Sequence, residues 1–183
     1  YDGRTDVARI IGEIMYDRMT AEFDAEELAD RYELVLPVPV HRHKKRVRGY
    51  NQSALIAGEF TKRINADIAS REMDPETGSG TDDQENYGYL SYSDNIDIAD
   101  RRLDSRDREY DKLLSCDDRI LIRNRETGMM RSLGPDARRE NIRGAFAVKE
   151  SRVADVSGRN ILLVDDIYTT GATVDEIARV LKE

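Results

Sequence analysis

The sequence contains one cysteine, Cys116, and only two histidines, His41 and His43. A single cysteine excludes an intrachain disulfide and a cysteine-rich zinc site. The spacing of His41 and His43 occurs among metal ligands, but without a further histidine or a nearby cysteine it does not predict a structural zinc site. Cys116 stands in a polar, acidic stretch, which indicates a structural or incidental role for this residue.

Long apolar runs are also missing. No segment approaches the roughly 18 apolar residues needed to cross a bilayer, and no cationic-then-apolar leader stands at the start. These absences predict a cytoplasmic protein without membrane contact. The 183 residues have the length of one ordinary domain.

Acidic residues are concentrated in one part of the chain. Residues 66–118 contain 16 Asp and Glu against 6 Lys and Arg, whereas the remainder contains 23 basic and 21 acidic residues. Much of this segment is also rich in Gly, Ser and Asn and poor in apolar residues, a composition typical of a flexible insertion. We therefore predict one domain over residues 1–183 that carries an acidic insertion at residues 66–118.

Helical and strand patterns alternate along the rest of the sequence. Apolar residues at helical spacing predict helices over residues 6–19, 51–64 and 172–182, with a short helix before residue 32. Apolar runs predict strands at residues 34–38, 119–124, 146–150 and 160–166. Because the last of these is almost wholly apolar, the pattern favours an α/β fold with a buried parallel sheet flanked by helices.

The segment ILLVDDIYTTGAT, residues 161–173, joins the last strand to the last helix. Its apolar strand ends at Asp165 and Asp166, and a turn of small and hydroxyl residues follows: Thr169, Thr170, Gly171, Ala172 and Thr173. Open α/β sheets bind ligands at the carboxyl ends of their strands. A turn of small residues before a helix offers backbone N–H groups to a phosphate. The Gly-Lys-Ser/Thr ending of a P-loop is missing, which argues against a nucleotide triphosphatase.

Two carboxylates would repel a bare phosphate, so their place beside this turn needs a reason. They suit a ligand that carries hydroxyls next to its phosphate, because carboxylates accept hydrogen bonds from a vicinal diol. Asp165 and Asp166 could also help to hold Mg²⁺, directly or through water. A ribose 5-phosphate meets both requirements. The residues alone leave a second interpretation open, namely an acidic strand end followed by a capped helix.

The same segment resembles the phosphoribosyl pyrophosphate motif of type I phosphoribosyltransferases along its whole length. The resemblance implies a Rossmann-like core that binds phosphoribosyl pyrophosphate with Mg²⁺. It assigns the ribose hydroxyls and the metal to Asp165 and Asp166, which would also be catalytic, and the 5-phosphate to residues 169–173.

A second segment, LVLPVPVHRHKKRVRGYNQSALIA at residues 34–57, is similar to the ComF-like, competence-associated branch of that superfamily. The resemblance implies that Arg48, Gly49 and Asn51 contact the ligand. It also implies a pyrophosphate-binding loop formed by His41, Arg42 and His43. The alternative is a solvated basic turn, which contacts nucleic acid or nothing at all.

A third segment, RNRETGMMRSLGPDARRENIRGAFAV at residues 123–148, resembles the same branch. Related enzymes have a mobile loop here that closes over the diphosphate and excludes water. The resemblance therefore makes Arg138 and Arg139 candidate catalytic residues and Asn141 a candidate ligand contact. The alternative is the charged start of a helix.

Three departures from that branch are visible. Met130 stands where the family often has glutamine, no cysteine-rich zinc segment precedes the domain, and the chain stops at Glu183, where further sheet is expected. The resemblance therefore implies a fragment or a C-terminally shortened member.

Two functions follow from the resemblance. The first is Mg²⁺-dependent transfer of a phosphoribosyl group to an acceptor that the sequence does not identify, with release of pyrophosphate. The second is a non-catalytic accessory role in DNA uptake and natural transformation, exerted through a helicase or recombination partner. The intact acidic pair and phosphate turn favour the enzyme, whereas the missing acceptor site favours the accessory role.

Overall fold

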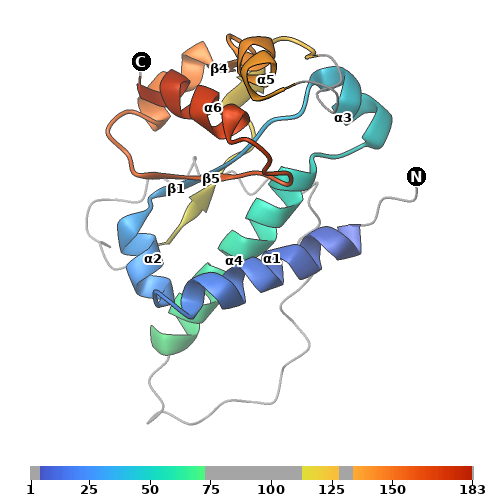
Figure 1. The fold of residues 1–183 in the computed structure, drawn as a ribbon. Coiled ribbons are helices and arrows are strands. Elements are labelled where there is room, and N and C mark those ends of the chain that lie inside the picture. The colour runs from blue at the N-terminus through green and yellow to red at the C-terminus, as the bar shows by residue number, and fades with distance from the viewer. Residues whose placement is uncertain (1–4, 73–112, 128–133, 183) are drawn as a thin grey trace.

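The computed structural model describes residues 5–72, 113–127 and 134–182 (Figure 1). A three-stranded parallel sheet has the order β2-β1-β5, and a separate antiparallel pair joins β3 to β4. The strands are β1 (Leu34–Pro37), β2 (Ser115–Cys116), β3 (Leu121–Arg123), β4 (Phe146–Val148) and β5 (Ile161–Val164). The helices are α1 (Thr5–Thr20), α2 (Ala25–Arg31), α3 (Arg42–Arg48), α4 (Gln52–Glu72), α5 (Pro135–Ile142), α6 (Ala172–Lys182) and the 3-10 helix η5 (Glu150–Asp155).

The parallel sheet lies between two layers of helices. Helices α1, α2 and α4 lie on one side of β1 and β5, and α5 and α6 lie on the other (Figure 1). Successive residues of β1 point to opposite sides, so Val35 joins the core under α1 and α4, whereas Leu34 and Leu36 join the core under α5 and α6. Burial on both faces explains why these strands are almost wholly apolar.

Helix α4 is the centre of the first core. Phe60 and Ile64 of α4 are fully buried, and α1 packs along this helix. Gly12 of α1 allows the close approach, because a Cβ atom at this position would lie 2.8 Å from the Cβ of Glu59. Closely packed residues of this kind keep the start of α4 in a fixed place relative to the sheet.

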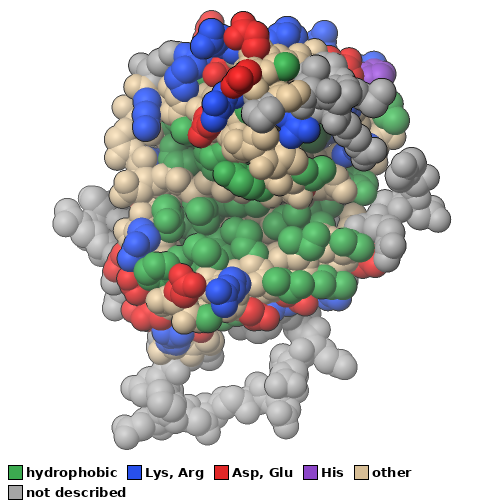
Figure 2. Space-filling view, in the orientation of Figure 1, with side chains coloured by type: hydrophobic (Ala, Val, Ile, Leu, Met, Phe, Trp, Pro, Cys, Tyr) green, Lys and Arg blue, Asp and Glu red, His purple; other side chains and the backbone are tan. Residues whose placement is uncertain are grey.

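Helix α1 confirms the helix predicted at residues 6–19 but buries only part of its apolar surface. Ala8 lies in the core with Met15 packed against it, whereas Ile10, Ile11 and Ile14 are exposed. Figure 2 shows a broad band of hydrophobic side chains across the face on which α1 and β5 lie. None of the described helices combines the length with the hydropathy that crossing a membrane requires.

Two local predictions differ from the structure. The basic stretch after β1, predicted as a loop, forms α3, because lysine and arginine favour helix and Gly49 ends it at a φ of 85°. The strands predicted at residues 119–124 and 146–150 exist as β3 and β4, but they pair with each other outside the parallel sheet.

The two ends of the predicted acidic insertion belong to the folded domain. Helix α4 continues to Glu72, and residues 113–118 include strand β2. The central part of the predicted insertion, residues 73–112, lies outside the described residues.

Candidate functional site

Two sequence motifs that are far apart in the chain meet at the carboxyl edge of the parallel sheet. Strand β5 pairs with β1 from Leu34 opposite Ile161 to Pro37 opposite Val164. The pairing continues past the strand, because the Val38 N–H donates to the Val164 carbonyl at 2.8 Å. The basic segment after β1 and the acidic pair after β5 therefore leave the sheet side by side (Figure 1).

The acidic pair is half-buried, and one member has a fixed orientation. Ser53 Oγ donates a hydrogen bond to Asp166 Oδ1 at 3.1 Å and accepts one from the Asp166 N–H at 3.2 Å. Burial, together with the neighbouring Asp166 charge, raises the pKa of Asp165 to about 6. Asp165 is therefore largely ionised at neutral pH and can accept hydrogen bonds from hydroxyl groups.

The turn after the acidic pair encloses a small hollow before α6. Gly171 has a φ of 76°, a conformation that favours glycine, and its carbonyl accepts the Asp175 N–H of the first helical turn at 2.9 Å. The side chain of the exposed Tyr168 lies over Gly171. Its phenolic oxygen would be only 3.0 Å from a Cβ atom placed at position 171. The hollow of about 10 Å³ holds no more than one water molecule.

A larger cleft of about 390 Å³ opens between the end of β1, α3 and β3. Pro39, Val40 and Leu121 supply part of its apolar lining. Its charged lining residues are Arg42, Lys45, Arg123 and Asp118. Three cations against one carboxylate make the cleft suitable for an anionic group.

Arg123 connects this cleft to the acidic pair. Its guanidinium hydrogen-bonds to Thr127 and lies 5.3 Å from the centre of the Phe146 ring. Burial lowers the pKa of Arg123, while the charges of Asp165 and Glu126 oppose that shift. Arg123 of β3 is thus a cation within electrostatic range of Asp165, and it stays fully protonated near neutral pH.

The predicted pyrophosphate residues have different surroundings. His41 precedes α3 as its N-cap, and the Nδ1 atoms of His41 and His43 each lie 3.9 Å from a carboxylate oxygen of Glu126. Arg42 lines the large cleft. Arg48 instead hydrogen-bonds to Gln52 at 3.0 Å.

Asn51 is buried, and it also lines the large cleft. It is 6% exposed, and its Nδ2 donates to the Val38 carbonyl at 3.0 Å, so this side chain supports the end of β1. Its Oδ1 atom has no hydrogen-bond partner among the described residues. Gly49, the neighbouring predicted contact, serves as the C-cap of α3.

Arg138, Arg139 and Asn141 lie on α5, so the segment is helical here, as its second interpretation predicts. Helix α5 packs against α6, and Arg139 lines a cleft of about 260 Å³ between the two helices. The Asn141 carbonyl accepts a hydrogen bond from Arg125 at 2.9 Å. Neither Asp165 nor Asp166 is among the residues that line that cleft.

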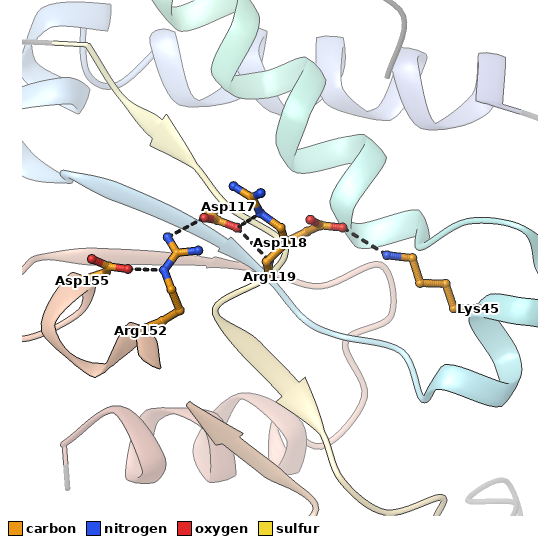
Figure 3. Close-up of polar contacts among 6 residues, drawn as sticks. All are labelled: Lys45, Asp117, Asp118, Arg119, Arg152 and Asp155. Atoms are coloured by element: carbon orange, nitrogen blue, oxygen red, sulfur yellow. Dashed lines mark hydrogen bonds and ion pairs between the residues drawn. The ribbon is translucent and has the colours of Figure 1, made fainter. Parts of the chain in front are cut away.

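Charged residues directly after β2 form hydrogen bonds and ion pairs with the elements around the site. Asp117 accepts hydrogen bonds from Arg152 Nη2 at 2.7 Å and from the Arg119 N–H at 2.8 Å, and Arg152 also pairs with Asp155 (Figure 3). The adjacent Asp118 holds Lys45 of α3 at 3.3 Å. The carboxyl end of β2 is thereby tied to η5 on one side and to α3 on the other.

Four residues of this site are missing from the sequence-based candidates: Ser53, Lys45, Arg123 and Asp118. Lys45 and Arg123 stand within the segments that carry the family resemblance, which is the one local signal for them. Ser53 also stands within one of these segments, residues 34–57, but its hydrogen bond to Asp166 appears only in the folded chain. Asp118 lies outside the segments and becomes a functional candidate only through its contact with Lys45.

The donor set fits a metal ion that keeps most of its water. Across residues 5–72, 113–127 and 134–182, no group of three or more His, Cys, Asp and Glu side chains could hold a metal. Asp165 and Asp166 offer two neighbouring carboxylates, and Mg²⁺ characteristically combines one or two carboxylates with waters and ligand phosphates.

Comparison with known proteins finds partial similarity to several curated proteins, of which two are described here. Over 65 residues the chain is 38% identical to DNA utilization protein YhgH of Escherichia coli O157:H7, a match that covers 36% of this chain and 27% of that protein. Over 64 residues it is 36% identical to Competence protein F of Haemophilus influenzae, covering 35% of this chain and 28% of that protein.

These matches support the predicted relationship to ComF-like, competence-associated proteins. The chain spans about a quarter of the length of the curated relatives it matches. No family model matches the chain. No solved structure matches it either.

Proposed function

We propose that this chain binds phosphoribosyl pyrophosphate with Mg²⁺ and transfers the phosphoribosyl group to an acceptor, releasing pyrophosphate. The observation that carries the proposal is that Asp165, half-buried next to Asp166, lines the small-residue turn and interacts electrostatically with Arg123, a lining residue of the cationic cleft. A ligand with a phosphate, vicinal hydroxyls and a diphosphate, in this order, has a complementary group for each of the three.

The ribose 5-phosphate would occupy the turn and the acidic pair. Asp165 and Asp166 would accept hydrogen bonds from the ribose hydroxyls, and backbone N–H groups of residues 169–173 would donate to the phosphate. The hollow in the turn is too small for a phosphate while Tyr168 lies across it. Tyr168 is 76% exposed, so its side chain can rotate into solvent when the phosphate enters.

The pyrophosphate end would extend into the large cleft. Arg42, Lys45 and Arg123 would compensate its negative charge, and the cleft volume of about 390 Å³ accommodates a diphosphate. When bound, Mg²⁺ would supply further neutralisation of the diphosphate, with Asp165 and Asp166 holding it directly or through water.

In the proposed reaction, a nucleophilic atom of the acceptor forms a bond to the anomeric carbon of the ribose. The bond from that carbon to the pyrophosphate oxygen breaks, and its electron pair leaves with the pyrophosphate. Positive charge develops on the ribose ring in the transition state, and the carboxylates of Asp165 and Asp166 would stabilise it. Arg42, Lys45 and Arg123 would stabilise the charge that accumulates on the departing pyrophosphate.

Isothermal titration calorimetry with three ligands tests the proposal. We expect phosphoribosyl pyrophosphate with Mg²⁺ to bind at least about tenfold more tightly than ribose 5-phosphate or pyrophosphate alone, because it engages the turn, the acidic pair and the cleft together. Absence of binding by all three ligands would contradict the proposed site. A screen for pyrophosphate release over candidate acceptors then tests catalysis, and a silent screen would favour the alternative below.

The alternative function is a non-catalytic accessory role in DNA uptake, exerted through a helicase or recombination partner. The observation that favours it is α3, where Arg42, Lys44, Lys45, Arg46 and Arg48 stand on a helix that buries none of its residues. Two partly similar proteins carry names that refer to DNA utilization and competence. An exposed basic helix suits the phosphate backbone of DNA or an acidic surface of such a partner.

Removing two charges from α3 tests this role. We expect Lys44→Ala with Arg46→Ala to weaken binding of a single-stranded oligonucleotide about tenfold and to lower the slope of log affinity against log salt by about 2, because two phosphate contacts are lost. Fluorescence anisotropy at several salt concentrations measures both quantities. The control removes two exposed lysines elsewhere, Lys62→Ala with Lys149→Ala. Equal losses in both double variants would show that α3 is not a specific contact surface.

A further inference from the structure

We propose that Ser53 is a positioning residue for the acidic pair, holding Asp166 in the orientation in which it meets the ribose hydroxyls. The inference rests on the proposed ribose-phosphate site and adds a residue to its supporting structure. Ser53 and Asp166 are separated by 113 positions in the sequence and meet only in the folded chain.

The contact between them is reciprocal. Ser53 Oγ accepts a hydrogen bond from the Asp166 N–H at 3.2 Å, which holds the main chain where β5 ends. The same hydroxyl donates to Asp166 Oδ1 at 3.1 Å, which fixes the direction of the carboxylate. Ser53 is 1% exposed, so water cannot replace the hydroxyl without a rearrangement of the core.

The helix that carries Ser53 is a rigid support. Phe60 and Ile64, two and three turns further along α4, are fully buried in the first core. At the start of the same helix, Asn51 Nδ2 donates to the Val38 carbonyl at 3.0 Å. Asn51, directly before α4, thus contacts the chain after β1, and Ser53, in the first turn of α4, contacts the chain after β5. A site on such an element keeps its geometry more precisely than a site on a loop.

The restraint acts on one end of the ligand site only. With one oxygen engaged by Ser53, the Asp166 carboxylate is limited to the rotamer that this hydrogen bond selects. The cations of the pyrophosphate cleft stand on other elements than Ser53: Arg42 and Lys45 belong to α3, and Arg123 belongs to β3. Loss of the Ser53 hydroxyl should therefore affect recognition of the ribose and leave the binding of pyrophosphate alone unchanged.

Calorimetry on the Ser53→Ala variant tests the inference. We expect Ser53→Ala to weaken binding of phosphoribosyl pyrophosphate with Mg²⁺ about tenfold and to change the affinity for pyrophosphate alone by less than about twofold. In an Asp166→Asn background the effect of Ser53→Ala should fall to about twofold or less, because Ser53 acts through the Asp166 carboxylate. Thr61→Val, which removes another buried hydroxyl from α4, serves as the control and should bind like the wild type.

The outcomes separate this inference from the proposed function. If the wild type does not bind phosphoribosyl pyrophosphate, both fail. If the wild type binds and Ser53→Ala binds equally well, or loses affinity equally in the Asp166→Asn background, the role of Ser53 is refuted and the site stands. Should circular dichroism show that Ser53→Ala is unfolded, the near-isosteric Ser53→Cys replaces it, with an expected loss of about threefold because a thiol is a weaker donor.

Discussion

Changing Asp165 and Asp166 together to asparagine is expected to weaken the binding of phosphoribosyl pyrophosphate by at least about 100-fold. Hydrogen bonds to a charged group contribute about 1.5–3 kcal/mol each, and the loss of two such acceptors exceeds the roughly 2.7 kcal/mol that corresponds to 100-fold. Asparagine has nearly the size of aspartate, so the half-buried positions remain filled. Calorimetry at pH 8, above the pKa of about 6 of Asp165, measures the loss.

The direction of the change distinguishes the two interpretations of this motif. If the pair were only the acidic end of a strand beside a phosphate turn, removing two negative charges would strengthen the binding of a phosphate ligand. A matched control, Asp17→Asn with Asp30→Asn, makes the same change in net charge at two exposed positions and should leave affinity within about twofold. Unchanged or tighter binding by the Asp165→Asn, Asp166→Asn variant would refute the ribose assignment.

The second large effect concerns Asp117, the carboxylate at the centre of the network in Figure 3. We expect Asp117→Asn to lower the free energy of unfolding by about 2 kcal/mol at pH 7, because Arg152 would lose its partly buried partner. Urea unfolding followed by circular dichroism measures the change. The neighbouring Asp118→Asn variant is the comparison, and its more exposed pair with Lys45 should contribute less than about 1 kcal/mol.

The effect of Asp117 should depend on pH in a defined direction. Burial by itself would raise the pKa of Asp117, but hydrogen bonds from the Arg119 N–H, from Arg152 and from the Arg119 side chain together lower it below its ordinary value. A lowered pKa in the folded state means that the stabilisation is complete above the unfolded-state pKa of about 3.9 and disappears as the pH falls through the folded-state value. The stability difference between wild type and Asp117→Asn should therefore be constant from about pH 7 to pH 5 and shrink below about pH 4. A difference that grows on acidification would contradict this role.

The local pattern of apolar residues was sufficient to predict the type and position of most helices and strands. Helices α1 and α6 and strands β1 and β5 occur where apolar periodicity and the flanking turn residues predict them. These patterns are reliable because each element must bury a stripe or a face of its own residues. The candidate acidic pair could also be located from sequence, since Asp165 and Asp166 directly follow the apolar run that forms β5.

The pairing of elements could not be predicted in the same way. Strands β3 and β4 have apolar runs like the others, but they form a separate antiparallel pair. The apolar pattern of a strand predicts which of its residues are buried, and it does not predict which strand lies next to it in the sheet. The helix α3 depends on the C-cap at Gly49, and a run of charged residues without an apolar stripe gives no periodic signal for a helix.

The sequence by itself determined which residues are chemically suited to a sugar phosphate: two adjacent carboxylates, a small-residue turn and a basic segment. Only the tertiary structure decided how they meet. Parallel pairing of β1 with β5 brings the basic and acidic segments to one edge, and α4 delivers Ser53 to Asp166 across 113 positions. The physical reason is that residue chemistry is a local property of the chain, whereas the direction of a side chain is set by packing and hydrogen bonds between elements distant in sequence.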